Sequence, residues 1–316
     1  MPLPELQLLE RIRNAAKSSR SARVRVGIGD DCAVLRTVPA EDWLVTTDLS
    51  LQGVHFRLDC DSAEAIGHRV LLRGLSDIAA MGGEPVAAFL SLAVPSRTPQ
   101  RWVDDFTRGL LRLARRYKVE LAGGDTAESR SGIVADIVVV GRVPRGDVVL
   151  RSGAQVGDEV YVTGHLGESA GTLAELKARR KPPASVPEPR VAVGRWLRAH
   201  RAATAMIDLS DGLSTDLAHI CQQSKVGAVV EASAIPLPAW LRRRNENKAL
   251  ALALHGGEDY ELLFTARPSR HIPRFIAGVR VTRIGRIVDG RRVWLQGTLG
   301  KTLLRAKGWQ HFTGRS

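Results

Sequence analysis

The stretch GIGDDCAVL, residues 27–35, places two adjacent aspartates, Asp30 and Asp31, on a glycine turn between two apolar runs. The runs VRVGI, CAVLR and WLVTTD follow one another closely around this turn. Short runs rich in valine, isoleucine and threonine that are bounded by glycine are typical of β-strands. The stretch therefore predicts a strand-rich beginning of the fold that carries paired negative charge at a turn.

Helix-like and strand-like segments intermix along the rest of the chain. We expect helices over residues 62–83 and 98–118, strands over 86–95 and 132–143, and a turn-rich linker over 144–158. This mixture is typical of an α/β or α+β protein. A chain of 316 residues suggests two domains at about 100–200 residues each. We place them at residues 1–150 and 151–316.

The chain has a formal net charge of +13, and its 46 lysines and arginines are spread along its length. No basic run is interleaved with aromatic residues, as proteins that bind single-stranded nucleic acid require. We therefore interpret the excess as a solvated surface and expect no nucleic-acid partner. No apolar run reaches the roughly 18 residues of a membrane span, and charges interrupt the N-terminal segment where a signal peptide is apolar. These features predict a cytoplasmic protein without a membrane partner.

Three cysteines, Cys32, Cys60 and Cys221, are widely separated in the sequence. They form no CxxC pair and match no metal-binding spacing. We expect three reduced thiols.

Aspartates recur where an apolar element meets glycine, serine or threonine. They occupy the positions Asp30, Asp31, Asp48, Asp77, Asp125, Asp208 and Asp211. Any one of them, taken alone, is more often a helix cap or a turn residue. Asp211 would then cap the helix that follows it, and Asp125 would serve a turn.

Taken as a set, these aspartates indicate a metal site, because buried carboxylates are costly unless they are paired or bound to a cation. Mg²⁺ takes oxygen ligands from one or two carboxylates together with water and phosphate groups. Several such ions suit a polyphosphate substrate. The sequence contains neither GxxxxGK[ST] nor a complete GxGxxG. The glycine-rich GHLGESAG either cradles a phosphate or permits close helix packing.

Seven stretches follow one another in a characteristic order: GIGDDCAVL, TTDLSLQGVHF, LSDIAAMGG, GGDT, RSGAQVGDEVYVTG, IDLSDGL and GGEDYEL. From about Gly27 to Trp309 the sequence resembles the thiamine-monophosphate kinase family, of the superfamily of aminoimidazole ribonucleotide synthetase. The resemblance implies an N-terminal α/β domain that binds ATP and Mg²⁺ and forms a β-barrel across a homodimer, and a C-terminal α/β domain. It also implies transfer of the γ-phosphoryl group of ATP to thiamine monophosphate, giving thiamine diphosphate and ADP.

The resemblance carries the site residues of that family onto this sequence. The implied ligands of several Mg²⁺ ions are Asp30, Thr46, Thr47, Asp48, Asp77, Asp125, Asp208 and Asp211. The implied ATP contacts are Gly124, Asp125, Arg151 and Ser210, and the implied contacts to thiamine monophosphate are His55, Glu258 and Trp309. The aspartates expected to act in catalysis are Asp30, Asp48, Asp77, Asp125 and Asp211.

One position departs from the family pattern. Gly74 stands where the family often has asparagine. Because the metal aspartate Asp77 is kept, this difference concerns local packing more than activity.

Four of the implied contacts have a plainer alternative when taken alone. His55 would be a strand histidine, Arg151 a surface arginine, Glu258 part of a turn, and Trp309 a cover for apolar surface. Only the order of the motifs favours the functional interpretation.

The chemistry of these residue types agrees with the implied reaction. A phosphate monoester has a second pKa of about 6, so at pH 7 it is mostly dianionic and needs no general base. The task is to bring two anions together, which cations and positioning achieve. Many carboxylates without an evident nucleophile–base pair therefore fit direct in-line phosphoryl transfer assisted by Mg²⁺.

Two alternatives remain. Relatives in the same superfamily couple ATP to ring closure, to selenophosphate formation or to hydrogenase maturation. The last two use a reactive cysteine or selenocysteine near the N-terminus and a C-terminal cysteine respectively. Here nothing before Cys32 would serve, and the sequence ends in FTGRS. The second alternative is a non-enzymatic basic protein whose binding to nucleic acid depends steeply on salt.

Overall fold

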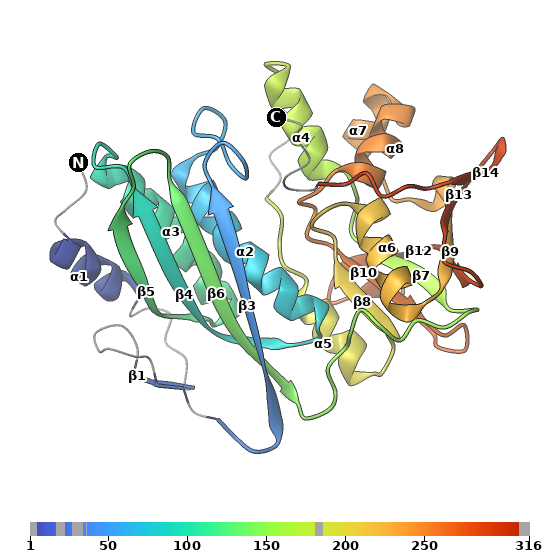
Figure 1. The fold of residues 1–316 in the computed structure, drawn as a ribbon, viewed down its shortest axis with the longest axis horizontal. Helices are drawn as coiled ribbons and strands as arrows, with labels where there is room; N and C mark the ends of the chain where they lie inside the picture. Colours follow the sequence, from blue (N-terminus) through green and yellow to red (C-terminus); the bar gives the residue numbers. More distant parts are fainter. Residues whose placement is uncertain (1–4, 17–22, 27–33, 36, 181–185, 310–316) are drawn as a thin grey trace. The chain divides into compact units, whose positions relative to one another are not determined.

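The computed structural model describes residues 5–16, 23–26, 34–35, 37–180 and 186–309 (Figure 1). Asp30, Asp31 and Cys32, which the sequence analysis singled out, lie outside these described residues. The chain divides into two compact units. The N-terminal unit holds residues 1–78 and 83–147, and the C-terminal unit holds residues 79–82 and 148–316.

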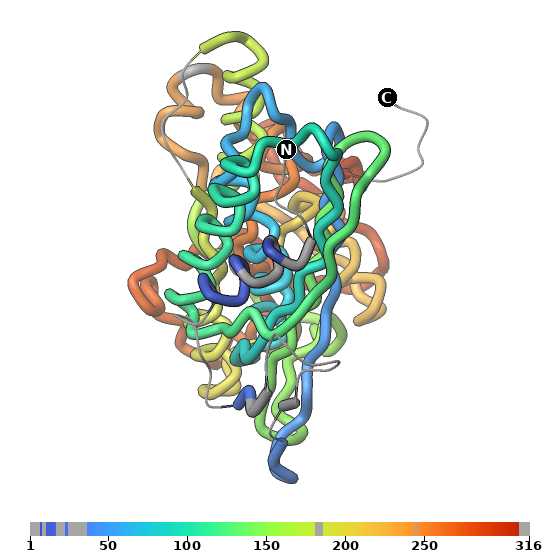
Figure 2. Tube along the Cα trace, turned by 90° about the vertical axis from the view of Figure 1, so that its left-hand side faces the viewer, coloured from blue at the N-terminus to red at the C-terminus, as the bar shows by residue number. Residues whose placement is uncertain are grey.

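A four-stranded sheet organises the N-terminal unit. Its strands are β3 (Glu41–Leu51), β4 (Glu84–Val94), β5 (Glu120–Glu128) and β6 (Val134–Pro144), in the order β3-β6-β4-β5. The β3–β6 and β6–β4 pairs are antiparallel, and β4 and β5 are parallel. Figure 2 shows these strands nearly edge-on, with α3 on one side of them. Among the described residues the sheet is open, and the barrel expected across a dimer stays a prediction.

Two long helices, α2 (Ala63–Ala80) and α3 (Gln100–Tyr117), cover one face of this sheet (Figure 1). Residues at every second position of β6, such as Ile137 and Val139, are buried, as a strand with one covered face requires. Gly67 and Gly109 permit the close crossing of the two helices. A Cβ atom at either position would lie 1.9 Å from a backbone oxygen of the other helix.

Three short elements complete the N-terminal unit. The strands β1 (Val24–Val26) and β2 (Val34–Leu35) form an antiparallel pair. The helix α1 (Glu5–Ala16) is tied to α3 by Arg11, which donates to both carboxylate oxygens of Asp104 at 2.6 and 2.8 Å.

A mixed sheet forms the core of the C-terminal unit, in the order β14-β13-β9-β12-β7-β10-β8. All neighbouring strands pair antiparallel except β13 and β9. Its strands are β7 (Glu159–Thr163), β8 (Ala205–Asp208), β9 (Gly227–Glu231), β10 (Leu262–Ala266), β12 (Val279–Val288), β13 (Val293–Gly297) and β14 (Gly300–Leu303), and β11 (Phe275–Ile276) pairs with β12.

Five α-helices are described in the same unit: α4 (Glu168–Lys177), α5 (Val191–Ala199), α6 (Leu213–Ser224), α7 (Ala239–Arg244) and α8 (Glu246–His255). The helix α6 packs its apolar residues, including Leu217 and Ile220, into the same buried cluster as Val162 of β7 and Val230 of β9. A short 3₁₀ turn, Ala232–Ala234, follows β9.

The mixed α/β fold class predicted from the sequence is confirmed. The elements β11, β13, β14, α7 and α8 were not predicted. Cys60 and Cys221 are free thiols. None of the helices in the described part of the chain is both long and apolar enough to span a membrane.

Candidate functional site

The first acidic cluster lies between β3 and α2 in the N-terminal unit. Thr46 and Asp48 are two residues apart on β3, so their side chains share the face of the strand on which Leu44 and Ser50 are buried. Asp77 comes from α2 and accepts a hydrogen bond from the hydroxyl of Thr46. The structure therefore brings together three of the residues that the sequence analysis assigned to metal binding.

The electrostatics of this cluster favour a bound cation. Burial, and then the negative charges of Asp77 and Asp136, raise the pKa of Asp48 to about 7, while Arg73 acts in the opposite direction. Ionised carboxylates at this position therefore repel one another and are partly desolvated. Oxygen ligands in a cluster of this kind fit Mg²⁺, whose charge relieves both costs.

Two other predicted ligands lie on the opposite face of the sheet. The side chain of Thr47 is exposed, and its hydroxyl donates to Asp136 at 2.8 Å. Asp125 pairs with Ser91, which pairs with Asp136, so this row of residues shares one face of the sheet. The structure thus separates the side chains of Thr47 and Asp125 from Asp48.

Asp125 lies within β5 and not in a turn, as the plainer alternative had it. One of its carboxylate oxygens accepts the Thr126 N–H at 2.8 Å. The preceding residue, Gly124, has a φ of +148°, and a Cβ atom there would lie 1.8 Å from the Leu90 carbonyl oxygen. Only glycine fits at this point of the strand pair.

His55 lies in the turn that follows β3, and not in a strand as its plainer alternative had it. Its Nδ1 accepts the Leu51 N–H at 2.9 Å. In a neutral imidazole the proton then resides on Nε2. The turn therefore presents His55 with Nε2 as a hydrogen-bond donor, which suits a phosphate oxygen.

The second acidic cluster lies where β8 ends and α6 begins in the C-terminal unit. Asp208 is the last residue of β8 and is 3% exposed. One oxygen of Asp216, on α6, accepts the N–H groups of Gly212 at 2.9 Å and Asp211 at 3.2 Å. Burial, and then the charges of Asp208 and Asp211, raise the pKa of Asp216 to about 8. As in the first cluster, burial and neighbouring carboxylates together raise the pKa of an aspartate.

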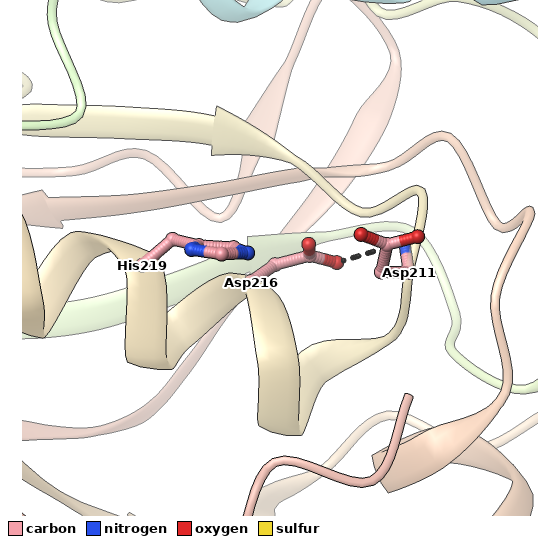
Figure 3. A group of neighbouring side chains, drawn as sticks. All are labelled: Asp211, Asp216 and His219. Atoms are coloured by element: carbon pink, nitrogen blue, oxygen red, sulfur yellow. Dashed lines mark hydrogen bonds between the residues drawn. The ribbon is translucent and has the colours of Figure 1, made fainter. Parts of the chain in front are cut away.

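Figure 3 shows Asp211 and Asp216 with His219, one helical turn further along α6. One ligand atom from each of the three side chains lies within 4.8 Å of the other two. Carboxylate oxygens suit Mg²⁺, whereas imidazole suits softer cations. The aspartates therefore account for the fit to Mg²⁺.

The plainer alternative for Asp211, a cap of the following helix, is not what the structure shows. Gly212 is the N-cap residue of α6, and the carboxylate that binds the free N–H groups there belongs to Asp216.

The two halves of the chain match known family models. Residues 29–143 match the model "AIR synthase related protein, N-terminal domain", and residues 155–297 match the corresponding C-terminal domain. Thiamine-monophosphate kinase of Salmonella typhimurium is 37% identical over 91% of this chain and 88% of its own length. The chain belongs to the thiamine-monophosphate kinase family.

Solved structures agree with this assignment. The crystal structure of thiamine-monophosphate kinase from Stenotrophomonas maltophilia superposes with a TM-score of 0.82 at 36% identity, covering 94% of this chain and 98% of that one. A structure described as AaThiL complexed with AMPPCP and TMP superposes with a TM-score of 0.77 at 32% identity, covering 98% and 97%.

The position where this chain departs from the thiamine-monophosphate kinase pattern has a packing reason. A Cβ atom at Gly74 of α2 would lie 2.4 Å from Cγ2 of Val139 on β6. Glycine thus lets α2 approach the sheet that carries Asp48, and the larger asparagine would collide with Val139.

Backbone hydrogen bonds bring together, around the turn between β8 and α6, three residues that the resemblance assigns to substrate binding. The Ser210 carbonyl accepts the Glu258 N–H at 2.8 Å, and the Asp211 carbonyl accepts the Trp309 N–H at 3.2 Å. Trp309 keeps half of its surface exposed. Arg151 is exposed at the start of the same unit, where the neighbouring Leu150 carbonyl accepts the Met206 N–H of β8.

Two residues of the second cluster were missed in the sequence analysis. Asp216 and His219 stand three positions apart in STDLAHI, which places them on one face of the helix that follows IDLSDGL. That spacing was visible in the sequence, but the motif IDLSDGL ends before Asp216 and His219.

Proposed function

We propose that this chain is an ATP-dependent kinase that phosphorylates thiamine monophosphate to thiamine diphosphate. Its main support is the similarity, over nearly the whole chain, to thiamine-monophosphate kinases and to AaThiL complexed with AMPPCP, an ATP analogue, and TMP. The superfamily alternatives and the nucleic-acid-binding alternative are not favoured, because relatives above 30% identity carry the kinase name.

Several Mg²⁺ ions would be held by the two acidic clusters. Thr46, Asp48 and Asp77 would supply oxygen ligands in the N-terminal unit, and Asp208 and Asp211 in the C-terminal unit. The raised pKa values of Asp48 and Asp216 support this assignment, because a cation would offset both the burial and the repulsion that raise them. Bound Mg²⁺ would neutralise the transferring phosphoryl group and assist in-line transfer.

The remaining family residues would bind the two substrates. Thiamine monophosphate would be contacted by His55, whose Nε2 suits a phosphate oxygen, and by Glu258 and Trp309. ATP would be contacted by Gly124, Asp125, Arg151 and Ser210. Asp30, Thr47 and Asp125 complete the proposed metal ligands, Asp30 lying outside the described residues and the other two on the face of the sheet opposite Asp48. We assign dimerisation, ATP binding and Mg²⁺ binding to the N-terminal domain, residues 1–150, and the C-terminal domain, residues 151–316, would contribute Arg151, Ser210, Asp208 and Asp211.

We also propose a homodimer formed through the N-terminal sheet. The face of β3 that points away from α2 exposes Val45 by 69% and Leu49 by 50%. Exposed aliphatic side chains on a broad sheet face are typical of an interface. Since the reaction consumes ATP, we place the enzyme in the cytoplasm.

The decisive experiment incubates the purified chain with ATP, Mg²⁺ and a panel of phosphate monoesters, and identifies products by mass. Thiamine diphosphate and ADP should form from thiamine monophosphate, and only with a divalent cation. Turnover of an aminoimidazole precursor without turnover of thiamine monophosphate would contradict the proposal. ATP-independent, salt-sensitive DNA binding alone would favour the binding-protein alternative.

A further inference from the structure

The segment between α8 and β10, residues 256–261, has an unusual backbone. Glu258 has a φ of +66° and Tyr260 a φ of +51°, although neither is glycine. Side-chain-bearing residues adopt this left-handed region at a cost, and they do so where surrounding contacts enforce it. The contacts that enforce it here are therefore informative about what the segment does.

Backbone hydrogen bonds hold one side of the segment against the turn that follows β8. The Glu258 N–H donates to Ser210 O at 2.8 Å, and the Tyr260 N–H donates to Leu209 O at 2.9 Å. In return the Leu209 N–H donates to the Glu261 carbonyl at 2.8 Å. These bonds fix where the segment lies on that side.

The Asp259 carboxylate holds the other side of the segment against the N-terminus of α4. Its two oxygens accept the Gly167 N–H at 2.6 Å and the Ser169 N–H at 3.3 Å. The Ser169 hydroxyl then donates to the Glu258 carbonyl at 2.6 Å. Gly167 is the N-cap of α4 and has no side chain to bind these N–H groups, so Asp259 acts as the cap from 92 residues away.

An ionised carboxylate at this cap is energetically unfavourable. Asp259 is partly exposed as a residue, but its carboxylate is desolvated enough, with Glu261 and Glu168 nearby, that its pKa is raised to about 7. Glu261 is itself held by Arg190 at 2.6 Å and by the Thr163 hydroxyl at 2.5 Å. A neutral Ser or Asn cap would avoid this cost. What the carboxylate adds is a second acceptor oxygen, which binds both N–H groups at once and so orients Glu258.

We propose that Asp259 is a positioning residue that holds Glu258 in the left-handed conformation needed to contact thiamine monophosphate. The inference rests on the proposed role of Glu258 as a substrate contact. Asp259 acts by joining the start of α4 to the 256–261 segment, and Ser169 completes the connection to the Glu258 backbone. Asp259 itself touches neither substrate.

The test compares Asp259→Asn with a matched control, Asn245→Ala. Asn245 also caps a helix of this unit, accepting the Lys248 N–H at 2.9 Å at the start of α8. Michaelis constants for both substrates and a urea unfolding midpoint are measured for each variant. D259N should raise KM for thiamine monophosphate about tenfold, a loss of about 1.4 kcal/mol of binding, and leave KM for ATP within about twofold. N245A should change neither constant.

A second variant, Ser169→Ala, keeps the proposal testable if D259N does not fold. It removes only the hydroxyl bond to the Glu258 carbonyl and should raise KM for thiamine monophosphate in the same direction. In an E258Q background, D259N or S169A should cause little further loss, because both act through Glu258.

Three outcomes would overturn the positioning role. In the first, D259N, or S169A in its place, raises both Michaelis constants equally. In the second, the effect of that variant adds fully to the effect of E258Q. In the third, the variant changes neither constant while E258Q raises KM for thiamine monophosphate. If E258Q is silent as well, the proposed substrate contact fails together with the inference. Absence of thiamine diphosphate formation by the wild type would instead contradict the proposed function itself.

Discussion

Replacing Asp48 by asparagine separates the destabilising effect of its buried negative charge from its proposed role as a metal ligand. The pKa of Asp48 is raised from 3.8 to about 7, first by burial and then by Asp77. Without a divalent cation, the folded protein at pH 8 must hold this group ionised among other carboxylates. An amide has nearly the same shape and no charge, so D48N removes the cost and also the proposed metal ligand.

The sign of the pH effect follows from the direction of the shift. A carboxyl whose pKa is raised on folding stabilises the fold below its unfolded pKa, and that stability is lost as the pH rises to the folded pKa. For Asp48 this window runs from 3.8 to about 7. The shift corresponds to an upper limit of about 4 kcal/mol at 1.36 kcal/mol per unit.

The measurable effect of D48N should be smaller than this limit. Part of the pKa shift of Asp48 comes from its interaction with Asp77 and belongs to the pair. The Asp48 side chain also keeps some contact with water, which screens charges. We therefore expect D48N, in chelator at pH 8, to be more stable than wild type by about 1–2 kcal/mol. The difference should vanish at about pH 3, where the carboxyl is mostly protonated in both the folded and the unfolded state.

Urea unfolding in chelator and in excess Mg²⁺ measures the free energy of unfolding without and with the cation. Wild type should gain stability on adding Mg²⁺, by about 2.7 kcal/mol at a hundredfold excess over Kd, and D48N should gain much less and lose most turnover. Asp42→Asn is the matched control on the same strand. Asp42 accepts the Gly146 N–H at 2.8 Å, and D42N should leave the Mg²⁺ response intact. A D48N variant that is less stable in chelator and still turns over at limiting Mg²⁺ would refute the reasoning.

Three further predictions address the other parts of the site. Asp211→Asn should abolish most turnover while the protein stays folded, and normal activity at limiting Mg²⁺ would exclude Asp211 as a ligand. Trp309→Ala should raise KM for thiamine monophosphate by roughly two- to thirtyfold through loss of cation–π contact with the thiazolium, with KM for ATP nearly unchanged; equal rises beside a lowered melting temperature would make Trp309 a cover for apolar surface. Val45→Lys with Leu49→Lys should convert a dimer into monomers in light scattering, whereas Val156→Lys, exposed in the C-terminal unit, should not; a monomeric wild type would contradict the proposed interface.

Strands such as β6 could be predicted from the sequence because their residues alternate in hydrophobicity, whereas β11, β13 and β14 could not. The strand β6 alternates buried and partly exposed residues along GIVADIVVVGRV, and its apolar content leaves little choice. The helix α8 was missed because ALALAL has the two-residue period of a strand as readily as it fits a helix. Its helical start depends on the Asn245 cap, and two of its three buried residues, Ala249 and Ala253, carry little hydrophobic signal.

Strand periodicity could also have divided the predicted metal ligands more finely. Thr46 and Asp48 are separated by two residues and Thr47 lies between them, so the side chain of Thr47 must point to the other face of β3. The structure shows this division, with Thr47 bound to Asp136 across the sheet. A family resemblance assigns neighbouring residues to one site, and a strand sends their side chains to opposite faces.

The acidic residues themselves show where sequence reasoning ends. Asp216 caps α6 from four residues after Gly212, whereas Asp259 caps α4 from 92 residues away. The first could be found from helix spacing, but the second depends on how β10 and α4 come together in the fold. The sequence alone does not distinguish a carboxylate that accepts backbone N–H groups from one that is a proposed cation ligand. In the structure Asp216 and Asp259 accept backbone N–H groups, whereas Asp48 is buried beside Asp77 and, more weakly, Asp136, with Arg73 acting in the opposite direction. We therefore base the proposed Mg²⁺ sites on where carboxylates converge, at Asp48 with Asp77 and at Asp208 with Asp211, more than on the number of aspartates.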